Sequence, residues 1–174
     1  MCFSASASFI ASGVLFPVSF YSIYNVFKYR INSKHDIGYF MFALIPFFFA
    51  IQQLTEGFIW MSIHSNNIAA MRIFTLIFIF FSHFFWPIWI PLTCYMFTQN
   101  KRSIRGVVLL FFLIVGVIIS FISVLYFFYL GGVLRENMAA SFPNYNINFI
   151  WGEILGTQAP KYIYILIIIL PLLF

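Results

Sequence analysis

Polar side chains that could do chemistry gather in one apolar stretch of the chain. Gln52, Glu56, Trp60 and His64 recur every four residues with Gln53 beside them, so a helix would carry them along one face. Glu56 is a candidate proton carrier, metal ligand or general base, because a carboxyl group is costly to bury in an apolar segment. The alternative is a structural carboxyl, hydrogen-bonded to Gln52 or to a serine to fix helix packing. The sequence leaves both interpretations open.

A second candidate, His83, precedes two prolines in the next apolar stretch. Pro87 and Pro91 each remove a backbone donor and free carbonyl groups in the turn before them, near His83 and Phe84. Bent helices of this kind line polar cavities in some proteins and serve only packing in others. His83 is therefore either a neutral imidazole bonded to a neighbouring helix, or a ligand or proton relay.

The amino terminus offers one thiol, Cys2. If Met1 is removed, Cys2 presents an amine and a thiolate, which form a chelating pair and a nucleophile. Together with Glu56 and His64, Cys2 could bind a soft metal ion. No ligand spacing of the paired-cysteine or zinc-protease type supports this site, so a terminal cap between helices is the favoured interpretation. The sequence identifies no cofactor.

The elements that must position these residues are four long apolar blocks, near 7–27, 37–61, 72–97 and 106–130. Hydrophobic residues make up 63% of the chain and charged residues 7%, which excludes a soluble domain and a nucleic-acid-binding surface. A bilayer core about 30 Å thick needs roughly 20 helical residues, and each block reaches that length. The predicted fold is an all-α, polytopic transmembrane bundle, a single domain whose surroundings are the lipid bilayer.

The last apolar run, 162–174, is too short to cross a bilayer. We interpret it as the beginning of a fifth helix, and we expect the full-length protein to continue beyond it. A site built partly by later helices would then be incomplete in this chain.

Lysine and arginine are concentrated in two short loops, which follow the first and third blocks. These residues are Lys28, Arg30, Lys34, Lys101, Arg102 and Arg105. Because basic loops stay on the cytoplasmic side of a membrane, both loops are predicted to be cytoplasmic and the amino terminus to lie on the opposite side. The net charge of +5 is then explained by the basic loops that orient the chain in the membrane.

Three motifs in the first hundred residues are distinctive: the opening 1–9, MCFSASASF; 52–60, QQLTEGFIW; and 85–91, FWPIWIP. They resemble an uncharacterised family of small bacterial multi-pass membrane proteins, whose members open Met-Cys-Phe-Ser-Ala and carry Gln-x-x-Glu-Gly-x-x-Trp and then Trp-Pro-x-Trp-x-Pro. The remainder of the chain is similar only in hydropathy. The resemblance implies about seven helices in the bacterial inner membrane and assigns no activity. Its signature positions are Cys2, Gln53, Glu56, Trp60, Trp86 and Pro87.

The favoured function is a transporter or sensor that binds or moves a small molecule or an ion. Its cavity would lie between the first three spans. The residues expected to line it are Ser4, Gln52, Gln53, Glu56 and His83. Polar residues concentrate on the second and third spans, whereas the fourth is almost featureless, and this distribution favours a site among the first three.

Two other classes of function stay open. The first is an intramembrane enzyme that acts on a lipid or quinone near the outer leaflet, with Glu56, His64 or Cys2 as its reactive group. The second is a structural or accessory subunit, held in a homo-oligomer or by a membrane partner, in which Glu56→Gln would be tolerated. An enzyme normally needs more polar residues than these spans provide.

Overall fold

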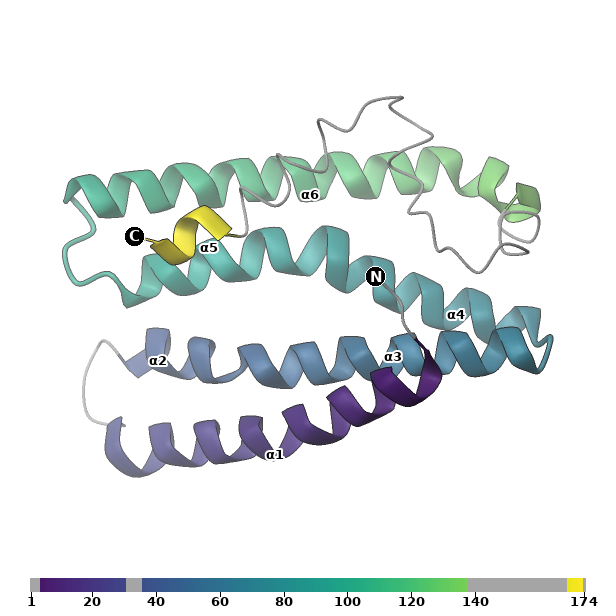
Figure 1. Ribbon diagram of the computed structural model, residues 1–174. Helices are drawn as coiled ribbons and strands as arrows, with labels where there is room; N and C mark the ends of the chain where they lie inside the picture. Colours follow the sequence, from purple (N-terminus) through teal and green to yellow (C-terminus); the bar gives the residue numbers. More distant parts are fainter. Residues whose placement is uncertain (1–3, 31–35, 138–168, 174) are drawn as a thin grey trace.

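The computed structural model describes the backbone of residues 4–30, 36–137 and 169–173, and the side chains of 4–29, 37–125 and 169–172. These residues form helices without any strand (Figure 1). In chain order the elements are α1 (Ala5–Arg30), α2 (Asp36–Ala43), α3 (Ile45–His64), α4 (Ile68–Ile79), η1 (Phe80–Phe85), α5 (Trp86–Phe97), α6 (Ile104–Asn137) and η2 (Leu170–Leu173).

Four helical segments are long and apolar enough to cross a membrane. They are Ala5–Tyr29, Ile37–His64, Ile68–Phe97 and Ile104–Leu125. Their positions confirm the four blocks expected from the sequence, and the chain is an all-α, multi-pass membrane protein. The expected fifth span falls largely outside the described residues, which include only its end, from Ile169 to Leu173. Cys2 also lies outside them.

The spans lie side by side in the order of the sequence, so that each contacts its neighbours in the chain (Figure 1). α1 packs on α3, α3 packs on α4, and α5 packs on α6, while the short η2 lies against α5. α1 and α6 therefore form the two outer sides of the bundle, and the second and third spans lie between them.

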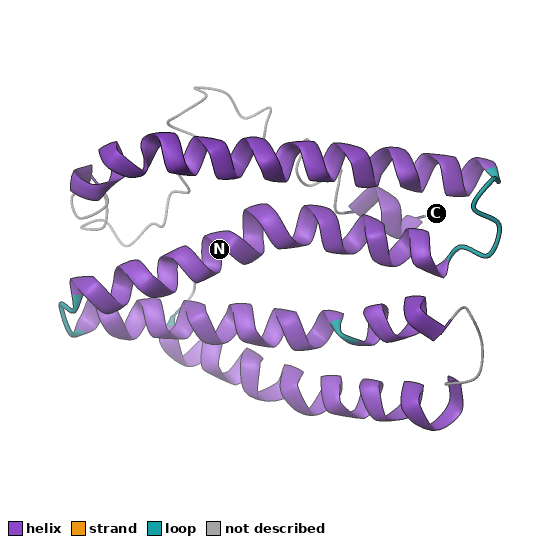
Figure 2. Cartoon of the chain, turned by 180° about the vertical axis from the view of Figure 1, so that it is seen from behind, coloured by secondary structure: helices purple, strands orange, loops and turns teal. Residues whose placement is uncertain are grey.

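Two of the spans are interrupted where proline removes a backbone donor. Between α2 and α3 the helix breaks at Leu44, two residues before Pro46, and Figure 2 shows this break as a short loop. In the third span the backbone widens into the π-helix η1, immediately before Pro87, and the Trp86 amide donates to the carbonyl of Phe81. A π-turn accommodates the lost hydrogen bond without ending the helix.

The α3–α4 turn, Ser65–Asn67, fixes the second span against the third. Asn66 adopts a left-handed backbone conformation with φ 51°, which asparagine tolerates better than most residues. Asn67 then caps α4, because its Oδ1 accepts from the amide of Ala70 at 3.1 Å. The turn is thus compact, and α3 and α4 lie antiparallel from its first residues onward.

Aromatic side chains fill the contact between α3 and the proline-containing part of the third span. Phe81, Trp86 and Ile90 are buried there, with Phe48, Phe85 and Trp89 packed on them. The ring centroid of Phe48 is 4.6 Å from that of Phe85 and 5.0 Å from that of Trp89. By contrast, serines are buried along α1, and large apolar side chains such as Val14 face outward. Small polar residues inside and apolar residues outside are typical of a helix bundle surrounded by lipid.

Candidate functional site

The candidate site is a group of buried polar residues on α3 and α4. α3 lies between α1 and the third span, so two of its sides are covered by protein, whereas Phe49 and Met61 on the same helix are exposed. Glu56 is 4% exposed and Trp60 6%, and both lie on the covered part of the helix. Counted from the end of α3 at His64, Trp60 is about 6 Å and Glu56 about 12 Å into the span.

Glu56 is the only carboxylate among the described side chains. Gln53 Nε2 donates a hydrogen bond to Glu56 Oε2 at 3.3 Å. Acidic side chains cost about 3 kcal/mol at the centre of a spanning helix and less toward its ends. The position of Glu56 is therefore costly but tolerable, and such acids mark functional positions more often than packing positions.

Gln52, in contrast, is used to join two helices. Its Oε1 accepts a hydrogen bond from Trp86 Nε1 on α5, and the two atoms are 2.5 Å apart in a buried contact. Under the structural interpretation of Glu56, the sequence offered Gln52 or a serine as its hydrogen-bond partner. In the structure Gln53 donates the hydrogen bond to Glu56, and Gln52 accepts a hydrogen bond that joins α3 to α5.

Four buried side-chain polar atoms have no hydrogen-bond partner among the described residues: Ser19 Oγ, Trp60 Nε1, Thr75 Oγ1 and Trp89 Nε1. Two of them, Trp60 Nε1 and Thr75 Oγ1, belong to the paired helices α3 and α4. Trp60 follows Glu56 by one turn of α3, while Thr75 belongs to α4 and is 8% exposed. The two helices pair so that the ring of Phe58 stacks on that of Phe74 at 4.8 Å. The stack brings Thr75 of α4 to about the depth of Glu56 in the span. Trp60 lies about 200° round α3 from Phe58, so the stack does not itself bring the Trp60 indole to Thr75.

Sequence reasoning selected Trp60 but missed Thr75. A single threonine in the apolar segment 68–79 carries no pattern that distinguishes it from a packing residue. In a helix, a threonine hydroxyl commonly bonds to a carbonyl group one turn earlier, as Thr93 Oγ1 does with Trp89 O at 2.7 Å. Thr75 lacks this bond, and that difference becomes visible only in three dimensions.

His64 ends α3 and is exposed at the α3–α4 turn. Its Nδ1 lies 2.8 Å from the carbonyl oxygen of Trp60, so the imidazole caps the last turn. His64 and Glu56 are two turns apart, one at the surface and the other buried. No group of three potential metal ligands occurs in the part of the chain that is described. Metal binding by Cys2 and His64 stays a prediction, because Cys2 is outside that part.

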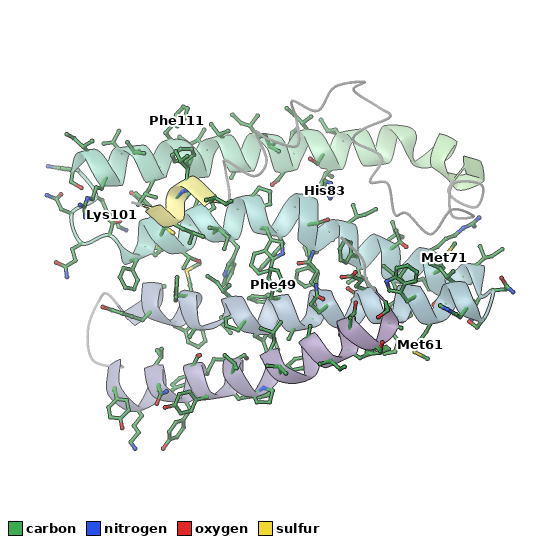
Figure 3. The ribbon with its side chains drawn as sticks, viewed as in Figure 1. Phe49, Met61, Met71, His83, Lys101 and Phe111 are labelled. Atoms are coloured by element: carbon green, nitrogen blue, oxygen red, sulfur yellow. The ribbon has the colours of Figure 1, made fainter. Side chains whose placement is uncertain are left out.

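His83 lies in η1, where Ser82 Oγ is 2.7 Å from its Nδ1. Figure 3 shows the imidazole on the side of the third span that faces α6, whereas α3 lies on the opposite side. The structure thus brings Gln53, Glu56 and Trp60 together on α3 and leaves His83 at a different helix contact. Ser4, also expected to line the cavity, caps α1 by accepting from the amide of Ala7 at 3.2 Å.

The two prolines of the third span serve the contact with α6. Pro91 cannot donate to the carbonyl of Pro87, and Gly116 of α6 approaches that carbonyl so closely that a Cβ atom at Gly116 would lie 2.0 Å from its oxygen. One turn away, Ser120 Oγ donates to the carbonyl oxygen of Phe84 at 3.0 Å. The backbone near the prolines is therefore met by small residues of α6, as in many close contacts of membrane helices.

Comparisons of this chain with protein-family models, with curated proteins and with solved structures find no match. The functional interpretation therefore depends on the contacts of these residues. Three polar residues are used in helix packing: Gln52, Trp86 and Ser120. Of the others, Gln53, Glu56 and Trp60 lie on α3 and Thr75 lies on the paired helix α4. We name these four residues the α3–α4 polar cluster.

Proposed function

We propose that this chain is a transporter or sensor of the bacterial cytoplasmic membrane, which binds or moves a small molecule or an ion at the α3–α4 polar cluster. The observation that carries the proposal is the buried Glu56, with the buried and unpartnered indole Nε1 of Trp60 one turn further along α3. A buried polar group without a partner costs about 1–3 kcal/mol. A ligand that accepts a hydrogen bond from the Trp60 indole would recover that cost beside Glu56.

The basic loops support a direction of access. If Lys28 and the Lys101–Arg105 segment are cytoplasmic, the α3–α4 turn faces the non-cytoplasmic side, as does the amino terminus. Trp60 is then one helical turn, and Glu56 two turns, below that surface. We infer that the ligand enters from outside the cell membrane.

The sequence resemblance supports the same cluster. We propose that the chain belongs to the uncharacterised bacterial family with the Met-Cys-Phe-Ser-Ala opening. Of its signature positions, Trp86 and Pro87 are explained by contacts with α3 and α6. Gln53, Glu56 and Trp60 fall in the α3–α4 polar cluster, and no packing contact accounts for the Trp60 indole nitrogen.

Two observations weigh against the alternatives. An enzyme acting on a lipid or quinone needs a second reactive group beside Glu56, yet His64 caps the end of α3 and His83 lies toward α6 (Figure 3). A purely structural or accessory subunit accounts for the Gln52–Trp86 bond but gives the unpartnered Thr75 hydroxyl no role. Binding of a small molecule or an ion needs no second reactive group beside Glu56, and it gives the unpartnered polar groups a role.

Mass analysis of the purified protein tests the proposal. Metals and small molecules retained by the full chain in mild detergent would be compared among the wild type, Glu56→Gln and Thr93→Val. Thr93 is a matched control, because it is buried in a span but its hydroxyl bonds to Trp89 O. We expect a stoichiometric component in the wild type and in Thr93→Val that is lost in Glu56→Gln.

The same experiment separates the alternatives. If nothing is retained, or if Glu56→Gln retains as much as the wild type while staying folded, the cluster is structural. A Cys2→Ser variant tests metal binding, since loss of a metal ion from that variant and from Glu56→Gln would place both residues at one metal site.

A further inference from the structure

Basic residues from three parts of the chain lie at one end of the bundle. Figure 1 shows that α1 ends, and that α5 turns into α6, at this end. Lys28 comes from α1, Lys101 and Arg102 from the α5–α6 turn, and Arg105 from the first turn of α6. All four are exposed. Figure 3 shows Lys101 at this end.

The ammonium groups of Lys28 and Lys101 lie close to tyrosine rings. Lys28 Nζ is 5.7 Å from the ring centroid of Tyr24 and 5.2 Å from that of Tyr29. Lys101 Nζ is 5.0 Å from the ring centroid of Tyr95. These distances allow cation–π attraction, which orients an ammonium group but leaves its charge uncompensated. Tyrosine also settles at the depth of lipid headgroups.

The α5–α6 turn is held in shape by its own hydrogen bonds. Asn100 Oδ1 accepts from the amide of Arg102 at 3.1 Å, and Ser103 Oγ donates to Asn100 O at 2.6 Å. Ser103 Oγ also accepts from the amide of Gly106 at 3.2 Å, which caps α6. Lys101 and Arg102 therefore project from an ordered turn, so that less entropy is lost when an anion binds to them.

One acidic residue, Asp36, begins α2 at this end, and its side chain is outside the described ones. The four basic residues outnumber it. The four cations with Tyr24, Tyr29 and Tyr95 form a surface that we name the basic aromatic end. We propose that the basic aromatic end selectively binds the phosphate headgroups of anionic phospholipids. This function is separate from the α3–α4 polar cluster and does not depend on it.

The test uses the full chain in a neutral detergent and measures the binding of phosphatidylglycerol and of phosphatidylcholine by native mass spectrometry. We expect the wild type to bind phosphatidylglycerol more tightly. Lys28→Gln and Lys101→Gln should each weaken that binding about fivefold, the effect of one basic residue beside an anionic membrane surface. Binding of phosphatidylcholine should change little, and added salt should reduce the difference between the two lipids.

Matched variants separate a headgroup site from a general effect of charge. Arg72→Gln removes a positive charge near the start of α4, at the other end of the bundle, and should leave phosphatidylglycerol binding unchanged. Tyr24→Phe keeps the ring beside Lys28 and should bind as the wild type does, whereas Tyr24→Leu should bind more weakly. Equal binding of the two lipids by the wild type, or equal losses in Arg72→Gln and Lys28→Gln, would overturn the proposal.

Discussion

Gly116→Ala should loosen the contact between α6 and the third span. The added Cβ atom would lie 2.0 Å from the oxygen and 2.9 Å from the carbon of the Pro87 carbonyl, which is backbone and cannot turn away. Ordinary contacts are about 3.5 Å, so α6 would have to move by more than 1 Å. That movement would stretch the bond from Ser120 Oγ to Phe84 O, now 3.0 Å, beyond hydrogen-bond range.

Three contributions determine how Gly116→Ala changes the free energy of unfolding. Overpacking costs about 1–3 kcal/mol, and loss of a hydrogen bond between membrane helices about 0.6–1.7 kcal/mol. Alanine is favoured over glycine in a helix by about 1 kcal/mol, which offsets part of the loss. We therefore expect Gly116→Ala to lower the free energy of unfolding by about 1–3 kcal/mol.

Gly13→Ala is the matched control, because a Cβ atom at Gly13 meets nothing within 4 Å. It should leave the stability unchanged or raise it by up to about 1 kcal/mol. Both variants can be measured by denaturant titration of the protein in mixed micelles. If Gly116→Ala is as stable as Gly13→Ala, α6 does not approach the Pro87 carbonyl as closely as the structure shows, and the structural role of the two prolines is wrong.

Two further predictions concern buried and capping hydrogen bonds, and both can be checked in the same titration. Trp86→Phe should destabilise the protein more than Trp89→Phe, because Trp86 donates to Gln52 whereas Trp89 Nε1 has no partner among the described residues. A double-mutant cycle of Trp86→Phe with Gln52→Leu should give a coupling energy of about 0.6–1.7 kcal/mol. A coupling energy of zero would show that the Gln52–Trp86 bond does not contribute to stability. Asn67→Ala should lower stability by about 1 kcal/mol through loss of the cap to Ala70, and an unchanged midpoint would contradict that role of the α3–α4 turn.

The spans could be predicted from the sequence because the bilayer dictates their length. The block predicted near 37–61 corresponds to the helical segment Ile37–His64, and 72–97 to Ile68–Phe97. Pro87 also indicated a disturbed helix near His83, and the π-helix η1 lies there. The sequence could not tell that this disturbance widens the helix, since a proline can also bend or end a helix.

Partners within the candidate site were harder to predict, because helical spacing reports neighbours on one helix only. Gln52 and Glu56 are one turn apart, yet Gln52 bonds to Trp86, thirty-four positions away. Thr75 was missed because a buried hydroxyl without a partner cannot be recognised from the sequence. The burial of Glu56 was expected from its place within an apolar span, whereas the burial of Trp60 and the missing partner of its indole required the packed structure.

The indole N–H resonance of Trp60 gives the most direct test of ligand binding at the α3–α4 polar cluster. Nitrogen-15 spectra would be compared for the wild type as purified, the wild type stripped of small molecules, and Glu56→Gln, with signals assigned through Trp→Phe variants. A bound ligand should shift the Trp60 resonance in the first sample relative to the other two, while Trp86, bonded to Gln52, keeps its position. A Trp60 resonance that is identical in all three samples would contradict a ligand at this cluster and leave its polar groups with a structural role.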